Sequence, residues 1–240
     1  MDLGIKGRRA IVCASSKGLG RACAIALANE GVHVTLTARG AEALKQTADE
    51  IRKAHPSVTV TEIVGDITTP AGREAVLKAC PEPDILINNA GGPPPGDFRN
   101  WTRDDWIKAI DANMLTPIEL IKATVDGMMA RKFGRIVNIS SGAARGAGAI
   151  GPHYNASKAA VEGLTRGYAA RLVKEGITVN AVAPSLIETD MMKGQSSLVS
   201  RIPVGRFGTV EEVAQAVMLL VNNPYMTGQT IAMSGGMAFN

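Results

Sequence analysis

Tyr154 and Lys158 are the residues whose types and spacing best suit proton transfer. The segment that follows Tyr154, NASKAAVEGLTRGYAARLV, has small and apolar residues at helical spacing, so both side chains are expected on one face of a helix. A cation beside the ring favours the phenolate and lowers a phenol pKa that is ordinarily about 10. A tyrosine tuned in this way can donate or accept a proton near neutral pH. The alternative is an ordinary surface pair on an amphipathic helix.

A glycine-containing turn near the start of the chain could hold a phosphate group. The segment Cys13–Gly20, CASSKGLG, follows an apolar run and opens a predicted helix. Gly18 and Gly20 allow backbone and ligand to approach closely, and the free N–H groups of the helix N-terminus favour a pyrophosphate. The alternative is an ordinary turn between a strand and a helix, because a lone Gly-x-Gly is a weak signal.

The end of the second predicted strand, TLTARG, favours NADP over NAD. Sites that take NAD usually have an acidic residue there, which binds the ribose hydroxyls. This chain has Ala38 and Arg39 instead, and Lys17 in the glycine turn could supply a second cation. Two cations and no acid match the extra negative charge of a 2′-phosphate.

The composition indicates one globular domain over residues 1–240. Hydrophobic residues make up 45% of the chain and charged residues 20%, which is typical of a protein with a sizeable core. The 26 basic and 22 acidic residues leave a net charge of only +4, and the basic residues are scattered. The cluster of Lys6, Arg8 and Arg9 is more typical of a solvated entry to the first strand than of a nucleic-acid patch, so no nucleic-acid partner is expected.

The cysteines and the N-terminal segment point to a reducing compartment. Cys13, Cys23 and Cys80 have neither disulfide nor metal-ligand spacing, so no metal site is expected. The N-terminus lacks the apolar core of a signal peptide, and no apolar run is long enough to span a membrane. A soluble cytoplasmic protein without a membrane partner is therefore expected.

The elements that must position these residues form an alternating pattern of short apolar runs and longer amphipathic ones. This pattern predicts an α/β fold with a doubly wound, Rossmann-type parallel sheet of about seven strands and helices on both faces. The predicted strands are 10–13, 32–36, 58–64, 85–87, 135–139, 178–182 and 230–233. The predicted helices are 21–30, 41–53, 70–79, the pair 102–113 and 116–132, then 155–175 and 209–221.

Further motifs make the chain resemble the short-chain dehydrogenase/reductase family. The motifs share the family's order and spacing: Gly18–Gly20, Asn88–Gly91 (NNAG), Asp111-Ala112-Asn113, Ser141 at the usual interval before Tyr154, and VNAVAPSLIETDM. The resemblance extends over essentially the whole chain, to the final SGGM. Within the family the chain is most similar to 3-oxoacyl-[acyl-carrier-protein] reductases and their paralogues, which implies an NADP-dependent carbonyl reductase.

The resemblance implies four catalytic residues. Tyr154 would be the general acid in the reductive direction, and Lys158 would lower its pKa and hold the nicotinamide ribose. Ser141 would bind the substrate carbonyl oxygen where negative charge develops. Asn113 would anchor a water that continues the proton path from Lys158.

The resemblance, together with the glycine turn and the two cations, also implies a set of residues that contact NADP(H). Asp66 would bind the adenine amino group, and Thr189 the nicotinamide carboxamide. The set comprises Ser15, Lys17, Gly18, Leu19, Gly20, Arg39, Asp66, Ile67, Asn88, Ala90, Gly91, Tyr154, Lys158, Pro184, Ile187 and Thr189.

Several of these residues have ordinary structural alternatives. Asp66 could simply cap a helix, and Asn113 could end one. Ser140 could replace Ser141, since only the spacing distinguishes them. His153 lies beside the tyrosine but lacks a nearby carboxylate to orient it, so it is expected in the cleft wall or at the surface.

The chain departs from the family pattern at three places. Ala14 replaces the first glycine of the turn, and we expect it to have an ordinary negative φ and to leave cofactor binding intact. Ser185 replaces a glycine after Pro184 and could narrow the nicotinamide pocket or donate a hydrogen bond. The substrate lid, at about 188–202, looks short, which weakens the assignment of an acyl thioester as substrate.

The substrate and partners follow from the resemblance only in outline. The substrate is expected to be a small carbonyl compound or alcohol, carried on acyl-carrier protein or coenzyme A if it is a 3-oxoacyl thioester. An apolar lining is expected if four lid residues reach the cleft: Met191, Met192, Leu198 and Val199. The alternatives are another hydrophobic ketone, a sugar or steroid alcohol, an epimerase, or a non-catalytic NADP sensor. A homotetramer paired through helices 116–132 and 155–175 is expected, although small residues of the second helix could instead pack on the chain's own sheet: Ala159, Ala160, Gly163, Gly167 and Ala170.

Overall fold

The computed structural model of the protein describes residues 3–92, 95–146 and 150–238, and for Met191 the backbone alone. Seven parallel strands form one sheet in the order β3-β2-β1-β4-β5-β6-β7, which confirms the predicted doubly wound fold. The strands are β1 (Arg9–Val12), β2 (His33–Ala38), β3 (Val60–Val64), β4 (Ile85–Asn88), β5 (Gly134–Ile139), β6 (Ile177–Pro184) and β7 (Thr230–Met233). The central strands β4, β5 and β6 are buried along their whole length, as a parallel sheet covered on both faces requires.

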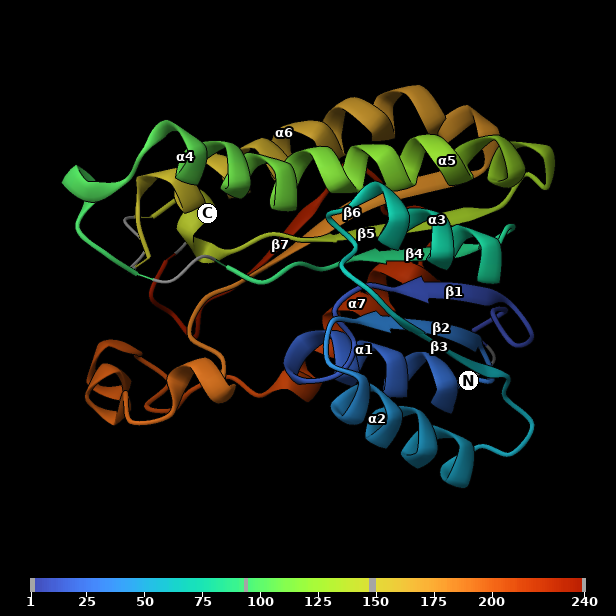
Figure 1. Ribbon diagram of the computed structural model, residues 1–240, viewed down its shortest axis with the longest axis horizontal. Helices are drawn as coiled ribbons and strands as arrows, with labels where there is room; N and C mark the ends of the chain where they lie inside the picture. The colour runs from blue at the N-terminus through green and yellow to red at the C-terminus, as the bar shows by residue number, and fades with distance from the viewer. Residues whose placement is uncertain (1–2, 93–94, 147–149, 239–240) are drawn as a thin grey trace.

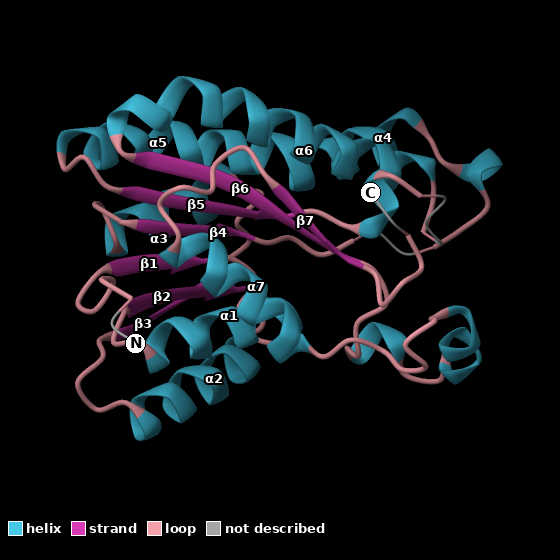
Figure 2. Cartoon of the chain, turned by 180° about the vertical axis from the view of Figure 1, so that it is seen from behind, coloured by secondary structure: helices cyan, strands magenta, loops and turns pink. Residues whose placement is uncertain are grey.

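Helices cover both faces of the sheet (Figures 1 and 2). One face carries α1 (Gly18–Asn29), α2 (Ala41–Ala54) and α7 (Val210–Asn222), and the other carries α3 (Pro70–Ala79), α4 (Arg103–Ile110), α5 (Thr116–Ala130) and α6 (Pro152–Leu172). Each face has its own apolar core. Leu27, Leu36 and Val217 belong to the first core, and Leu86, Ile121 and Val179 to the second.

Local sequence explains where several helices begin. Thr69, Thr102 and Thr209 each accept a hydrogen bond from a backbone N–H in the first turn of the helix that follows. Most predicted boundaries lie within three residues of the observed ones, and Pro70–Ala79 and Thr230–Met233 match them. The prediction was wrong for the helix pair, because α4 continues into α5 through a π-helical turn at Asp111–Leu115.

The carboxyl ends of the strands gather the loops that carry the candidate residues. Figure 1 shows the segment between β6 and α7 projecting beyond this edge on the side of α1, while α4 projects beyond it on the other side. The projecting segment contains two 3₁₀ helices, Asp190–Met192 and Ser196–Arg201. No described helix is long and apolar enough to cross a membrane.

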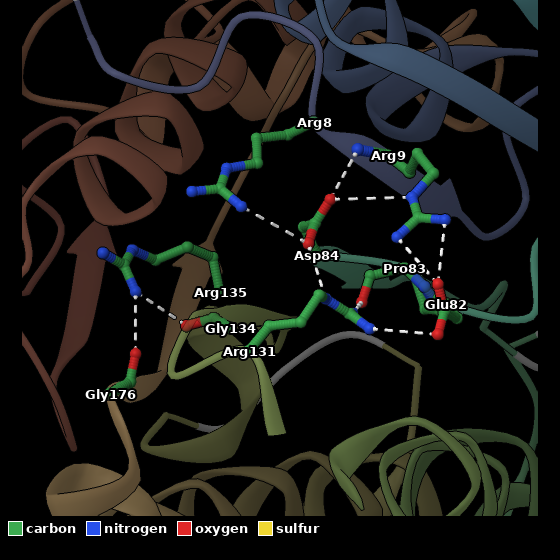
Figure 3. A network of polar contacts seen from close by, with 9 residues as sticks. All are labelled: Arg8, Arg9, Glu82, Pro83, Asp84, Arg131, Gly134, Arg135 and Gly176. Atoms are coloured by element: carbon green, nitrogen blue, oxygen red, sulfur yellow. Dashed lines mark hydrogen bonds and ion pairs between the residues drawn. The ribbon is translucent and has the colours of Figure 1, made fainter. Parts of the chain in front are cut away.

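The amino ends of the strands are joined by a cluster of charged side chains (Figure 3). Asp84 accepts the backbone N–H of Arg9 at 3.0 Å and pairs with the guanidinium groups of Arg8 and Arg131 at 3.7 and 3.2 Å. The side chain of Asp84 is only 5% exposed. The sequence suggested that Arg8 and Arg9 are solvated residues at the start of β1. In the structure both also take part in a specific network of ion pairs.

Candidate functional site

The glycine turn between β1 and α1 has a constrained backbone. Ala14 has a φ of 50°, so the expected negative φ is wrong. The close packing of Gly20 explains the positive φ of Ala14, because a Cβ on Gly20 would lie 2.3 Å from the Ala14 carbonyl oxygen. Ser15 is fully buried, and its hydroxyl accepts the Thr37 backbone N–H at 3.0 Å. Ser15 therefore fixes the turn to β2 from within.

The N-terminus of α1 lies next to the segment that follows β6. Gly18, Leu19 and Gly20 form the first helical turn, where backbone N–H groups have no partner within the helix. The Thr189 methyl group lies 3.7 Å from the position of a Cβ on Gly18. Lys17 Nζ is 3.7 Å from an Asp190 carboxylate oxygen, and both side chains are largely exposed. Residues distant in sequence thus meet where a pyrophosphate would lie.

A cleft of about 890 Å³ extends from the glycine turn along the carboxyl ends of β2, β3 and β4. The predicted cofactor residues that line it are Arg39, Asp66, Ile67, Ala90 and Gly91. A Cβ on Gly91 would meet no described atom within 4 Å, so the backbone there is open to a ligand. The cleft size, the glycine backbone and the exposed Arg39 fit the adenosine half of a dinucleotide that carries a 2′-phosphate.

Asp66 keeps a negative charge at the end of β3. Burial raises the pKa of its carboxyl, but bonds from the Thr68 backbone N–H at 3.0 Å and the Thr68 hydroxyl at 2.8 Å, with the charge of Arg39, lower it overall. Asp66 does not cap α3, because Thr69 does. The carboxylate remains at the cleft wall as a hydrogen-bond acceptor.

A chain of amides fixes the loop that follows β4. Asn88 donates to the Asn138 side chain at 2.8 Å, and Asn138 donates to the Thr165 hydroxyl at 2.9 Å. All three side chains are buried. This chain joins β4, β5 and α6, so the backbone of Ala90 and Gly91 is held at a fixed height above the sheet.

Tyr154 and Ser141 meet at the carboxyl end of β5. The Ser141 side chain lies near enough to the phenol group to lower its pKa. Ser141 precedes the short 3₁₀ helix Gly142–Ala144, and its hydroxyl accepts the Ala143 backbone N–H at 3.2 Å. Ser140 instead donates to the Lys158 backbone carbonyl at 3.2 Å. The structure thus brings Ser141, and not Ser140, to the tyrosine.

Burial controls the charge of the Tyr154–Lys158 pair. Burial raises the pKa of Tyr154, and the Ser141 side chain lowers it only in part. Burial also lowers the pKa of Lys158 to about 7. Lys158 Nζ donates to the Ile139 backbone carbonyl at 2.7 Å and lies 5.7 Å from the centre of the tyrosine ring. The pKa of Tyr154 is thus raised and not lowered as expected, because burial of the phenol outweighs the effect of Ser141.

Asn113 lies in the π-helical turn, at the wall of a small internal cavity. Its side-chain N–H groups donate to the Ala109 carbonyl at 3.1 Å and the Ser157 hydroxyl at 3.2 Å. The cavity, of about 10 Å³, is also lined by Lys158, Asn88 and Thr116. The side-chain oxygens of Asn113, Asn88 and Thr116 are buried without a partner in the described ranges. One water molecule fits both the volume and these three oxygens.

The end of β6 and the segment after it contain the residues that were predicted to border the nicotinamide. Pro184 is the last residue of β6, and the side chain of Ile187 is 7% exposed and packs in a core. Ser185, the departure from the family pattern, lies over Gly142: its hydroxyl is 2.2 Å from the position of a Cβ on that glycine. Ser185 therefore narrows the space beside Ser141.

The cleft wall near α4 is aromatic. His153 is 1% exposed and stacks on Trp101 with ring centres 4.0 Å apart, and burial lowers the pKa of its imidazole. This places His153 in the cleft wall, one of the two expected positions. Three of the four residues that were expected to supply an apolar lining are Met192, Leu198 and Val199. They are half-buried in the segment between β6 and α7 and lie outside the set of described residues that line the cleft. The side chain of Met191 lies outside the described part of the structure.

Sequence reasoning missed the residues that support the catalytic group. Ser157, Asn138 and Thr165 hold Asn113 and Asn88 in place, and Glu162 binds Arg145 at 2.9 Å. Glu162 could have been suspected, because it lies eight residues after Tyr154 and so on the same face of the helix as Tyr154 and Lys158.

Comparison with known proteins gives consistent results. A family model described as "Enoyl-(Acyl carrier protein) reductase" matches residues 13–238. The chain is 33% identical to 3-oxoacyl-[acyl-carrier-protein] reductase FabG of Vibrio cholerae over 246 aligned positions, which cover 98% of this chain and 99% of the relative.

Two solved structures are similar over nearly the whole chain. L-sorbose reductase from Gluconobacter frateurii, complexed with NADPH and L-sorbose, has a TM-score of 0.92 at 30% identity, covering 99% of this chain and 98% of the other. A 3-oxoacyl (acyl-carrier-protein) reductase from Agrobacterium tumefaciens with NADP bound has a TM-score of 0.90 at 28% identity, covering 98% of this chain and 96% of the other.

Proposed function

We propose that this chain, which belongs to the short-chain dehydrogenase/reductase family, is an NADP(H)-dependent reductase of 3-oxoacyl thioesters. The observation that carries the proposal is the convergence of Tyr154, Ser141 and a buried Lys158, whose Nζ lies 5.7 Å from the centre of the tyrosine ring. The tyrosine ring is next to the cleft, because a Cβ on Gly92, which lines the cleft, would lie 3.3 Å from it. The full-length similarity to 3-oxoacyl-[acyl-carrier-protein] reductases supports the thioester substrate.

The proposed reaction divides the work between cofactor and protein. Bound NADPH supplies the hydride that reduces the carbonyl carbon. Ser141 and Tyr154 both hydrogen-bond the carbonyl oxygen, where negative charge develops, and Tyr154 donates its proton to that oxygen. A raised pKa keeps the tyrosine protonated at neutral pH, which suits the reductive direction.

The proton lost by Tyr154 is restored from inside the protein. Lys158, with a pKa lowered to about 7, can carry a proton at physiological pH, and it lines the small cavity that Asn113 also lines. A water bound there by Asn113 and Thr116 would connect Lys158 to the region beneath the cofactor ribose. Asn113 would thus help to supply protons to Lys158 by holding this water.

The proposed cofactor preference rests mainly on Arg39. Its exposed guanidinium lines the cleft at the end of β2, where a carboxylate would repel a 2′-phosphate. Asp66 and Ile67 would contact the adenine, and Ala90, Gly91 and the backbone at Asn88 the ribose. Gly18, Leu19 and Gly20 would bind the pyrophosphate, with Lys17 beside them. Pro184, Ile187 and Thr189 would border the nicotinamide.

The deciding experiment is a turnover assay. The purified protein is mixed with acetoacetyl coenzyme A or with L-sorbose, and oxidation of NADPH and of NADH is followed separately. Turnover of the thioester with NADPH but not NADH is expected, and Tyr154→Phe should lose at least about 1,000-fold in kcat while still binding NADPH.

Other results of the assay would change the proposal. Turnover of L-sorbose but not of the thioester would replace the acyl substrate by a hydroxylated ketone. NADPH binding without turnover of any ketone tested would favour a non-catalytic sensor.

We further propose that the protein is a homotetramer paired through α5 and α6, and that residues 188–202 form its substrate lid. A Cβ on Gly163 or Gly167 would meet no described atom within 4 Å, so this face of α6 does not pack on the chain's own sheet. Gly163 and Ala170 are exposed. Light scattering is expected to give four times the mass of 25.1 kDa, and a monomer would contradict the pairing.

A further inference from the structure

Glu162 is a buried carboxylate that the proposed reaction does not use. Its side chain is 6% exposed, on the face of α6 that also carries Lys158 one turn earlier and Tyr154 two turns earlier. A buried charge of this kind is costly unless it is paired. Because Glu162 is buried on the same helix face as the proton-transfer residues, the groups that it pairs with indicate its role.

The partners of Glu162 come from both ends of the turn that carries Ser141. Arg145, which ends the 3₁₀ helix Gly142–Ala144, donates from Nε to one carboxylate oxygen at 2.9 Å. Ser140, immediately before Ser141, has its hydroxyl 3.5 Å from the other carboxylate oxygen. The same hydroxyl bonds the Lys158 carbonyl on α6. Both ends of the Ser141 turn are thus tied to the helix that carries Tyr154: Arg145 binds the Glu162 carboxylate, and Ser140 binds the Lys158 carbonyl beside it.

We propose that Glu162 and Arg145 are positioning residues, which hold the Ser141 hydroxyl at the distance from Tyr154 that carbonyl reduction needs. The proposal rests on the proposed function of the same site. Neither residue touches the reacting atoms. They act through the turn Ser141–Ala144. Among the described residues, the ion pair between Arg145 and Glu162 is the only one that holds this turn in place.

The physical reason is that the reaction tolerates only a small displacement of the groups that bind the carbonyl oxygen. Ser141 must bond Tyr154 and the carbonyl oxygen at the same time, and a misplacement of about 1 Å can cost about 100-fold in rate. Stability alone does not explain the pair, because a well-packed apolar pair of similar volume is often as stable as a buried ion pair. Binding of the adenosine half should not depend on it, since Arg39 and Asp66 lie on other elements.

The test compares variants that separate positioning from stability. Arg145→Met leaves the carboxylate buried and unpaired, whereas Arg145→Met combined with Glu162→Leu replaces the pair by apolar groups. Arg131→Met, which removes one partner of the buried Asp84 at the opposite edge of the sheet, is the matched control. The readouts are the unfolding temperature, the NADPH dissociation constant, kcat and KM for the ketone, and the ionisation of Tyr154.

The expected result is a loss of catalysis without a loss of cofactor binding. The double variant should recover the unfolding temperature lost in Arg145→Met, yet both should have kcat reduced at least about tenfold, with NADPH binding within about twofold of the parent. Arg131→Met should lower the unfolding temperature and leave kcat unchanged. Parental kcat in the double variant, or loss of NADPH binding in parallel with kcat, would overturn the proposal.

Ultraviolet titration of Tyr154 makes the test independent of turnover. Ser141 lowers the pKa of the phenol, so a displaced Ser141 should move the Tyr154 titration to higher pH, as in Ser141→Ala, with Tyr154→Phe identifying the signal among the three tyrosines. A shift in a protein that turns over no ketone would uphold the positioning role and overturn the proposed function. An unshifted titration in both Arg145 variants would overturn the positioning role.

Discussion

Lys158 shows how burial can reverse an electrostatic expectation. Four-residue spacing correctly places it near Tyr154, but the residue is 2% exposed and its ammonium group bonds a neutral carbonyl. Desolvation disfavours the charged form of both groups, so it lowers the pKa of the lysine, raises that of the tyrosine and moves the two values apart. The ammonium is then a stronger acid than the phenol, so proton transfer from Lys158 to a Tyr154 phenolate is downhill, which suits a relay that restores the tyrosine proton.

Lys158→Met should stabilise the protein below about pH 7. The folded pKa of about 7 lies below the ordinary 10.5, so the folded chain binds fewer protons than the unfolded chain between these values. Burial of the charged lysine lowers the free energy of unfolding by its full amount below about pH 7, and this loss disappears as pH rises through 10.5. The gain has an upper limit of about 5 kcal/mol at 1.36 kcal/mol per pKa unit, before the lost bond to Ile139 is subtracted.

Urea unfolding of both proteins at about pH 6 and about pH 10 measures this effect. The difference in unfolding free energy should shrink at the higher pH. A difference that is independent of pH would contradict the lowered lysine pKa.

Arg39→Ala should weaken NADPH binding and leave NADH binding nearly unchanged. Loss of a charge-assisted contact to a phosphate costs about 1.5–3 kcal/mol, or roughly 10–100-fold in dissociation constant. Lys17→Ala should cost less, because Lys17 is shared with Asp190. Fluorescence titration with both cofactors measures this difference. An equal weakening of NADH binding would contradict a contact between Arg39 and the 2′-phosphate.

The residues of the site were predictable to different degrees. Tyr154 and Lys158 follow from spacing because they lie four residues apart on one helix. Asn113 lies in the π-helical turn and was identified only through the family resemblance. The sign of the tyrosine pKa shift did not follow, since burial depends on packing that no short motif records. Glu162 and Asn138 act through partners distant in sequence, so their roles required the fold.

At the scale of elements, the turn between β1 and α1 combines strain with function. Ala14 at a φ of 50° occupies a conformation that costs an L-residue other than glycine roughly 1 kcal/mol. The turn keeps this conformation because Gly20 packs against the Ala14 carbonyl and Ser15 bonds Thr37. Contacts on both sides thus determine the backbone that would hold the pyrophosphate.

Ala14→Gly should therefore stabilise the protein by about 0.5–1 kcal/mol, because glycine adopts a positive φ without the steric penalty. Ala75→Gly, at an exposed position inside α3, should instead destabilise it by about 1 kcal/mol. Chemical denaturation of the two variants beside the parent tests both signs. A loss of stability in Ala14→Gly would show that the turn is unstrained.

Element types could be predicted better than element junctions. Alternating periodicities identified all seven strands and the helices between them, because each period reflects which face is buried. The join between α4 and α5 could not be found in this way. A π-helical turn adds a residue to the helical repeat, so the apolar pattern breaks there as it would at a loop.

At the scale of the whole molecule, the two edges of the sheet have different tasks. The carboxyl edge carries the cleft and Tyr154, while the amino edge carries Asp84 with its arginines (Figure 3). Arg135 donates its backbone N–H to the Asp84 carbonyl at 2.9 Å and its guanidinium to the Gly176 carbonyl, so these contacts link β5 and β6 to β1 and β4. The ion network therefore holds together strands that are far apart in sequence.

Asp84→Asn should destabilise the protein by about 3 kcal/mol, because it removes the buried carboxylate shared by three guanidinium groups and leaves Arg9 and Arg131 only the exposed Glu82. NADPH binding should be unaffected, since the cleft is at the other edge. Asp49→Asn, which breaks an exposed pair with Lys45 and Arg52, is the control and should leave the denaturation midpoint unchanged. Equal effects of the two substitutions would mean that the cluster does not hold the strands together.

The separation of the two edges also bears on how this protein can be altered. Substitutions at the arginine cluster and in the loops of the cleft share no contacts, so their effects on the free energy of unfolding should add. Stabilising changes near Asp84 can then offset the losses that accompany new loop sequences during directed evolution. The same edge offers a place to attach the protein to a solid support, with the cleft left open for use as a biocatalyst.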